Sequence, residues 1–201
     1  MPYSTSIRNE VFKNASGKYT LCLDSHALIE AGGIKKLIEY YKANPETNDL
    51  LQGPLWHDDL KTYCTQFNPE WRENMFGVWG KNKEAYEKGE PFEIPSMGLG
   101  LFTCRTAAWQ GFNEKFRGFG GEEGYIHEKF RRAGGKCLCL PWLKWNHRFY
   151  RPAGVAYPNL LEDRVWNYFI GWLEILKDPG HPFIEETVQA FTGNLPEPSI
   201  S

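Results

Sequence analysis

The sequence lacks any hydrophobic run long enough to cross a membrane. Its longest apolar stretches, residues 19–23 and 166–176, fall far short of the ~20 residues that a spanning helix needs. The N-terminus also lacks the basic segment followed by an apolar run that marks a signal peptide. We therefore expect no membrane span and a cytoplasmic protein.

An excess of basic residues is absent as well. The formal net charge is −2 and the pI is about 6.2, whereas a nucleic-acid backbone is bound by clustered Lys and Arg. We therefore expect no nucleic-acid partner. The composition, 41% hydrophobic and 24% charged over 201 residues, is typical of one soluble globular domain.

Cysteines with metal or disulfide spacing are missing too. The chain has 5 Cys, an odd number, and no two of them form a CxxC pair. Cys137 and Cys139 alternate around one residue and would share one face of a strand, which favours packing over metal binding. We expect all five thiols to be reduced and mostly buried.

Aromatic residues, by contrast, are abundant. The chain has 8 Trp, 10 Tyr and 13 Phe. Such side chains fill cores, and their flat faces also stack on the apolar faces of sugar rings. The composition therefore leaves room for a glycan-binding function.

Apolar periodicity predicts alternating strands and helices, and therefore an α/β fold. Expected strands cover residues 19–23, 50–55, 95–103 and 137–140, and expected helices cover residues 34–43, 122–133 and 160–176. Residues 56–93 show no sustained period, and we expect a long, partly helical excursion there. The Pro-containing tail after Gly193 is expected to be loose.

Asp24 and His26 follow the first predicted strand. Residues two apart in an extended segment project to the same side, so a carboxylate and an imidazole converge on one point. Such ligands suit Mn²⁺ or a related divalent ion. The alternative is an Asp that caps the next turn beside a solvated His.

Gly120-Gly121-Glu122-Glu123 places two carboxylates at the start of a predicted helix. The glycines let the backbone approach a ligand closely, and a Glu can hold a sugar hydroxyl by a charge-assisted hydrogen bond. The alternative is that the acids simply complement the helix dipole.

His147 lies in an aromatic and basic segment, residues 142–151, whose cations Lys144, Arg148 and Arg151 could hold a diphosphate. A His among them could complete a metal site, although a lone His is more often structural. We assign no role to the remaining histidines, and we expect one of them, His127, to be a surface side chain.

Taken in order, these segments resemble the GT-A glycosyltransferases, most closely the polypeptide N-acetylgalactosaminyltransferases and the related galactosyltransferase carboxyl-terminal region. The resemblance covers residues 7–151. It rests on Ile7-Arg8-Asn9, the Asp24-Ser25-His26 metal motif, the Gly-rich segment with Gly98 and Gly100, Phe119-Gly-Gly-Glu122, and His147-Arg148-Phe149.

The resemblance implies a Rossmann-like mixed sheet flanked by helices. It implies Mn²⁺ bound by Asp24, His26 and His147, and transfer of a hexose or N-acetylhexosamine from a UDP-sugar to a hydroxyl of a glycan, peptide or other acceptor. The expected donor-binding residues are Arg8, Gly98, Gly100, Gly120, Gly121, Arg148 and Arg151.

Two acidic residues are the expected catalytic pair. Glu122 would position the sugar. Glu123 stands where the N-acetylgalactosaminyltransferases carry Asn and the inverting galactosyltransferases carry an Asp base, so it would be a general base if the enzyme inverts and an acceptor contact if it retains. An inactive relative or a glycan-binding module is the alternative function.

The family's first βα units, which bind the nucleotide base, should precede Ile7, but only six residues do. We therefore expect one N-terminally incomplete catalytic domain with little activity alone, in which residues 152–201 form a C-terminal helical extension.

Overall fold

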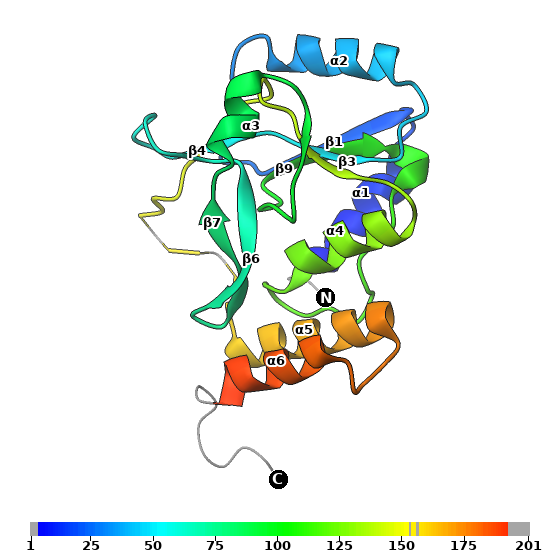
Figure 1. Cartoon of the computed structure of the whole chain (residues 1–201), viewed down its shortest axis with the longest axis vertical. Helices are drawn as coiled ribbons and strands as arrows, with labels where there is room; N and C mark the ends of the chain where they lie inside the picture. The colour runs from blue at the N-terminus through cyan, green and yellow to red at the C-terminus, as the bar shows by residue number, and fades with distance from the viewer. Residues whose placement is uncertain (1–3, 153, 156, 193–201) are drawn as a thin grey trace.

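The computed structural model describes residues 4–152, 154–155 and 157–192 as a mixed α/β structure (Figure 1). The loose tail expected after Gly193 lies outside the described residues. No helix in the described part of the chain is long and apolar enough to cross a membrane.

The main sheet has five strands in the order β1-β9-β3-β10-β8. Only β3 and β10 run parallel to each other, and the other neighbours are antiparallel. The expected mixed sheet is thus confirmed. Its strands are β1 (Tyr19–Leu23), β3 (Leu50–Gln52), β8 (Phe92–Glu93), β9 (Leu101–Arg105) and β10 (Cys137–Cys139).

A second sheet of four short strands has the order β2-β11-β4-β5. The chain passes from one sheet to the other at Gly53, where an added Cβ would collide with the carbonyl of Leu143, so the single strand expected over residues 50–55 is split. The strands are β2 (Ala27–Ile29), β4 (Leu55–Trp56), β5 (Tyr63–Cys64) and β11 (Trp145–His147).

Helices cover both faces of the main sheet. Phe12 of α1 (Arg8–Asn14) stacks on Phe102, whereas Tyr41 of α2 (Gly33–Ala43) bonds to Thr103, 2.8 Å away. Adjacent residues of a strand point to opposite faces, so α1 and α2 lie on opposite sides of β9. The remaining short helical elements are η1 (Thr5–Ile7), η2 (Thr106–Ala108) and α3 (Lys83–Lys88).

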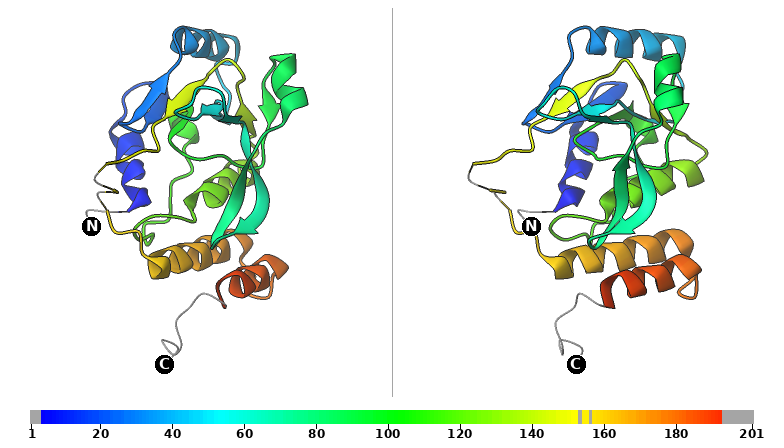
Figure 2. Two further views of the ribbon diagram at one scale, coloured as in Figure 1. Left: turned by 90° about the vertical axis from the view of Figure 1, so that its left-hand side faces the viewer. Right: turned by 60° about the vertical axis from the view of Figure 1, so that its left-hand side comes forward.

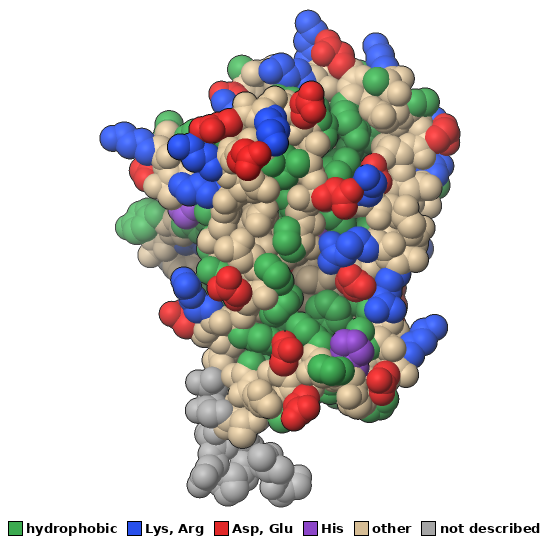
Figure 3. All heavy atoms as spheres, in the orientation of Figure 1, with side chains coloured by type: hydrophobic (Ala, Val, Ile, Leu, Met, Phe, Trp, Pro, Cys, Tyr) green, Lys and Arg blue, Asp and Glu red, His purple; other side chains and the backbone are tan. Residues whose placement is uncertain are grey.

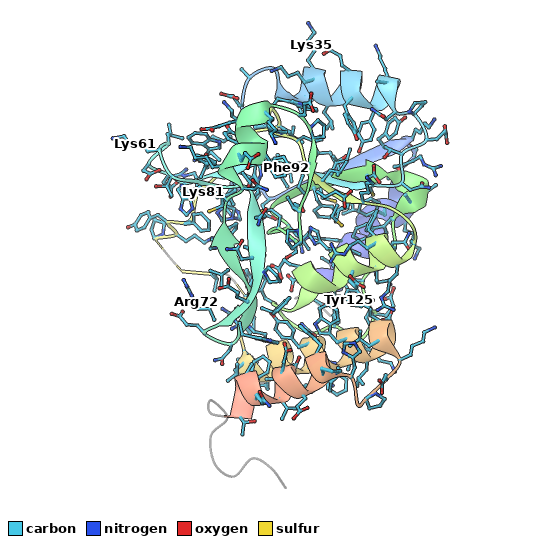
Figure 4. The ribbon with its side chains drawn as sticks, in the orientation of Figure 1. Lys35, Lys61, Arg72, Lys81, Phe92 and Tyr125 are labelled. Atoms are coloured by element: carbon cyan, nitrogen blue, oxygen red, sulfur yellow. The ribbon has the colours of Figure 1, made fainter. Side chains whose placement is uncertain are left out.

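The predicted helix over residues 122–133 is present as α4 (Glu122–Arg132) and lies between the sheet and the C-terminal helices (Figure 2). It packs on α5 (Leu161–Leu176), which in turn contacts α6 (Pro182–Thr192). Tyr125 of α4 points toward α5 (Figure 4), and its hydroxyl donates to Glu174 at 2.9 Å. Helices α5 and α6 are therefore packed onto the rest of the described structure.

Residues 56–93 hold one short helix, as expected, but they are dominated by a β-hairpin that the sequence did not predict. Its strands are β6 (Gln66–Arg72) and β7 (Met75–Gly80). Both turn residues, Glu73 and Asn74, have positive φ, which is the geometry of a two-residue type I′ turn.

An aromatic cluster fixes the turn end of the hairpin to the C-terminal helices. Trp71 stacks on Phe183 and contacts Tyr168, and the Tyr168 hydroxyl accepts from the backbone N–H of Phe76 at 2.7 Å. Figure 4 shows Arg72 at this end of the hairpin, beside α5 and α6.

The five cysteines are free, as expected, and four of them are buried. Burial raises the pKa of the Cys137 thiol to about 12. Charged side chains of both signs are interspersed over the face shown in Figure 3, in agreement with the near-neutral net charge.

Candidate active site

A single pocket of about 800 Å³ collects most of the expected site residues. It is bounded by the end of β1, by β11, by the Gly98–Gly100 segment, by the start of α4 and by the β6–β7 hairpin. The expected residues that line it are Arg8, Asp24, Gly98, Gly100, Glu122, Glu123, His147 and Arg151.

Asp24, His26 and His147 form a cluster whose ligand atoms all lie within 4.8 Å of one another. The Nε2 atoms of the two histidines are 2.8 Å apart, and Asp24 Oδ2 lies 3.8 Å from His26 Nε2 and 3.9 Å from His147 Nε2. A triangle with these sides has a point about 2.1 Å from every corner, the usual length of a bond from a divalent metal to nitrogen or oxygen. The three side chains therefore fit a divalent cation.

The local fold explains this convergence. The backbone N–H of Asp24 donates to the carbonyl oxygen of Gly100, and this hydrogen bond lies at the end of the β1–β9 pairing. Strand β11 pairs with β2 so that His147 lies opposite Ala27. This pairing brings His147 beside His26 although 121 residues separate them.

The two imidazoles are arranged to offer lone pairs. Burial, reinforced by repulsion from His26, lowers the pKa of His147 to about 4, so the ring is neutral near pH 7. The lone pair of the neutral ring can lie on Nε2, the atom that faces His26 and Asp24, and such a nitrogen is a suitable metal ligand. The proton is then on Nδ1, which is buried and has no hydrogen-bond partner among the described residues.

Two arginines flank the triad. Arg8 reaches Asp24 at 3.7 Å with one nitrogen and Glu122 at 4.0 Å with another. Arg151 lies with Nη2 2.7 Å from His26 Nε2 and donates to it, because a guanidinium has no acceptor. Both cations thus sit where a diphosphate beside a metal would need them.

The acid pair lies at the opposite side of Arg8 from the metal ligands. Glu122 is 1% exposed, and burial raises its pKa despite the opposing charge of Arg8. Glu123 is 8% exposed, and burial together with repulsion from Glu122 raises its pKa to about 8. The pair therefore retains a proton near pH 7, as two adjacent buried carboxyls must.

The expected donor-binding glycines have two different surroundings. Gly98 and Gly100 line the pocket, and a Cβ on Gly100 would lie 2.7 Å from the Trp145 ring and 3.2 Å from Asp24 Oδ2. Gly120 and Gly121 instead have positive φ, and their closest neighbours are side chains of the α5 helix.

Arg148 is exposed and lines a smaller groove with Ser25 and His26, next to the main pocket. Lys144 lies elsewhere, 3.6 Å from Glu30. The prediction that His127 is a surface side chain is wrong: it is fully buried, because the α4 face that carries it packs against the sheet.

Sequence reasoning missed two walls of the pocket. The β6–β7 hairpin contributes Phe67 and Trp79, and the C-terminal part contributes Tyr157 and Arg164. The Trp79 ring contacts Phe67 edge-on at 4.4 Å. Aromatic residues on both sides of Glu73-Asn74, at positions 67, 71, 76 and 79, are a sequence signal for the hairpin.

Comparison with known proteins supports the fold. No protein-family model matches the sequence. No curated protein matches it either. A crystal structure of GalNAc-T7 with UDP, GalNAc and Mn²⁺ matches 98% of this chain at a TM-score of 0.67 and 17% sequence identity. The protein has the GT-A glycosyltransferase fold.

The match covers 39% of the GalNAc-T7 chain, so the protein spans about two fifths of that structure's length. A crystal structure of A197 from STIV matches 73% of this chain and 68% of its own, at 17% identity and a TM-score of 0.44. The match to the GalNAc-T7 structure spans nearly the whole of this chain and therefore includes α5 and α6.

Proposed function

We propose that the protein is a metal-dependent glycosyltransferase that moves a hexose or N-acetylhexosamine from a UDP-sugar to an acceptor hydroxyl. The observation that carries the proposal is one pocket lined by Asp24 and His147 of the three-residue cation cluster and by a buried acid pair, with Arg8 between the cluster and the acids. The GT-A fold and the UDP, GalNAc and Mn²⁺ in the similar structure are consistent with it.

In this proposal the ligands Asp24, His26 and His147 hold Mn²⁺. The ion, when bound, supplies Lewis-acid stabilisation of the departing diphosphate. Arg8 and Arg151 add positive charge on either side of the ligands. Such pre-arranged charges stabilise negative charge that develops in a transition state.

The acceptor oxygen attacks the anomeric carbon, and the bond from that carbon to the diphosphate oxygen breaks. Glu122 holds a sugar hydroxyl, because its buried Oε2 has no hydrogen-bond partner among the described residues and a donor there would satisfy it. If the configuration inverts, Glu123 accepts the proton of the attacking hydroxyl in its ionised form, which a pKa of about 8 makes the minor form at pH 7 and the major form above pH 8.

If the configuration is retained, Glu123 contacts the acceptor and the proton leaves with the diphosphate. The two cases are separated by NMR of the product with a donor of known α configuration. An α product excludes Glu123 as the base, whereas a β product requires one on that side of the sugar.

Titration calorimetry with UDP tests the proposal. We expect saturable UDP binding in Mn²⁺ that disappears with chelator and is weakened at least ~10-fold by Asp24→Ala. Glycan binding without any metal-linked UDP binding would favour the alternative, a glycan-binding module that uses the aromatic wall. Lack of both interactions would remove the proposal.

A further inference from the structure

Gln52, at the end of β3, is the centre of a buried hydrogen-bond junction. It is 1% exposed. Its Nε2 donates to the carbonyl of Gly98 at 2.8 Å and to that of Leu101 at 3.3 Å. Its Oε1 lies 2.6 Å from His127 Nε2. Because carbonyls take both amide hydrogens, the partners fix the orientation of the amide and leave Oε1 to accept from His127.

His127 continues the junction into α4. The side chain is 0% exposed, and burial, with a smaller effect of Arg131, lowers its pKa to about 3. Its Nδ1 lies 2.6 Å from the carbonyl oxygen of Glu123.

Oxygen atoms next to both ring nitrogens would suit a charged ring. Burial without a carboxylate partner outweighs this, since an unpaired buried charge is very costly. We therefore assign the neutral ring with its proton on Nε2, donating to Gln52.

The junction joins two walls of the pocket without lining it. On one side, the carbonyls of Gly98 and Leu101 bracket the Gly98–Gly100 segment. On the other side, Glu123 belongs to the first turn of α4 with Glu122. An apolar pair of the same volume would fill this space, but it would leave α4 free to slide, whereas the hydrogen bonds of Gln52 to His127 and to the carbonyls of Gly98 and Leu101 specify one arrangement.

We propose that Gln52 and His127 are positioning residues that hold Glu122 and Glu123 at a fixed place relative to the Gly98–Gly100 segment. The catalytic meaning of this position rests on the proposed function. The positioning itself is a property of the folded chain and is measured without turnover.

The test compares His127→Leu, which removes the N–H, with Ile126→Val, which removes one buried methylene from the adjacent position of α4. Glutamate titration is followed by ¹³C NMR, and amide hydrogen exchange is followed at Gly98 and Gly100. In His127→Leu, loosening of the first turn admits water, so the Glu123 midpoint falls from about 8 by at least ~1 pH unit. Exchange at the two glycines rises at least ~10-fold. We expect Ile126→Val to lower the stability of the protein but to leave the Glu123 midpoint and the exchange rates of the two glycines unchanged.

Two further variants keep the test decisive if His127→Leu does not fold. His127→Gln places an amide N–H near the position of Nε2 and should restore both readouts toward those of the wild type, while Gln52→Met should reproduce the defect. Where transfer is measurable, the defective variants lose at least ~10-fold in kcat with KM changed less than ~3-fold.

The same Glu123 midpoint and glycine exchange in His127→Leu or Gln52→Met as in Ile126→Val would overturn the proposal, whether or not the protein transfers sugar. Changed NMR readouts in a protein that neither binds UDP nor transfers sugar would keep the positioning and reject the proposed function.

Discussion

The two ends of the pocket carry different ionisable groups, and burial shifts the pKa values of these groups in opposite directions. At the metal end, Asp24, His26 and His147 are partly exposed, and burial keeps His147 neutral with a lone pair to offer. At the acid end, Glu122 and Glu123 are almost fully buried and burial keeps a proton on the pair. Desolvation therefore favours the neutral form at both ends. It leaves His147 with a free lone pair, and it leaves the glutamate pair with a proton.

The comparison shows how one fold supplies both kinds of group. The three residues of the cation cluster stand where strands end and water can enter, whereas the acids begin a helix enclosed by the sheet and α5. Arg8 spans the two ends with contacts at 3.7 Å and 4.0 Å, so a change at one end is expected to reach the other through this side chain.

The largest effect is expected from the titration of the acid end. Because the pKa of Glu123 is raised from 4.5 to about 8, its stability contribution is complete below pH 4.5 and is lost as pH rises to 8. We expect a fall of at most ~1.4 kcal/mol per pH unit, about 4 kcal/mol between pH 5 and pH 8. In Glu123→Gln the fall should be less than half of that.

Urea unfolding at several pH values measures this loss, with the exposed Glu70→Gln as control. An equal slope in the wild type and Glu123→Gln would mean that Glu123 is not the group that titrates.

The second effect concerns Gly121, which directly precedes helix α4 and its two glutamates. Gly121 has φ +88°, and a Cβ there would lie 3.3 Å from Asn167 and Tyr168 of α5. We expect Gly121→Val to lower the free energy of unfolding by about 3 kcal/mol, from positive φ and crowding together. Thermal unfolding measures it, and Gly134→Val, which also has positive φ but open space, isolates the backbone part.

Sequence patterns predicted the metal end better than the acid end. A buried strand that stops at an acidic residue identified Asp24, and the resemblance added His147. Helix α4 was also predicted, but its full burial was not. The helical spacing of Ile126 and Phe130 did not assign the polar His127 to the face that packs on the sheet, so this residue was placed on the surface. The spacing also could not show that α5 covers a second face, so the raised pKa of Glu123 could not be anticipated.

The hairpin escaped prediction for a local reason. The register of β6 and β7 shifts between Asn68 and Trp71, and Pro69 and Glu70 at that shift are exposed. The irregularity interrupts the period of two that marks a strand. Strand β2, with three residues, is too short to show any period.

The third prediction addresses the metal end. We expect Asp24→Ala, His26→Ala and His147→Ala each to weaken Mn²⁺-dependent UDP binding at least ~10-fold, about 1.4 kcal/mol. The losses should not add, because the three serve one ion. Calorimetry of single and double variants measures this, and additive losses would contradict a shared ion.

The smallest effect separates two cations that the sequence treated alike. Arg151 contacts His26 at 2.7 Å, whereas Lys144 faces Glu30 at 3.6 Å. We expect Arg151→Ala to weaken UDP binding about 3-fold, ~0.6 kcal/mol, and Lys144→Ala to leave it unchanged. Equal effects in the same titration would indicate general electrostatics instead of a local contact.

The β6–β7 hairpin is fixed at both ends, by the bridge from Phe67 to Ser96 near its base and by Trp71 and Phe76 against α5 and α6 near its turn. A hairpin that is held at its base and at its turn moves less than one that is held at its base alone. We therefore expect the wall that carries Trp79 to keep its position when the pocket is occupied.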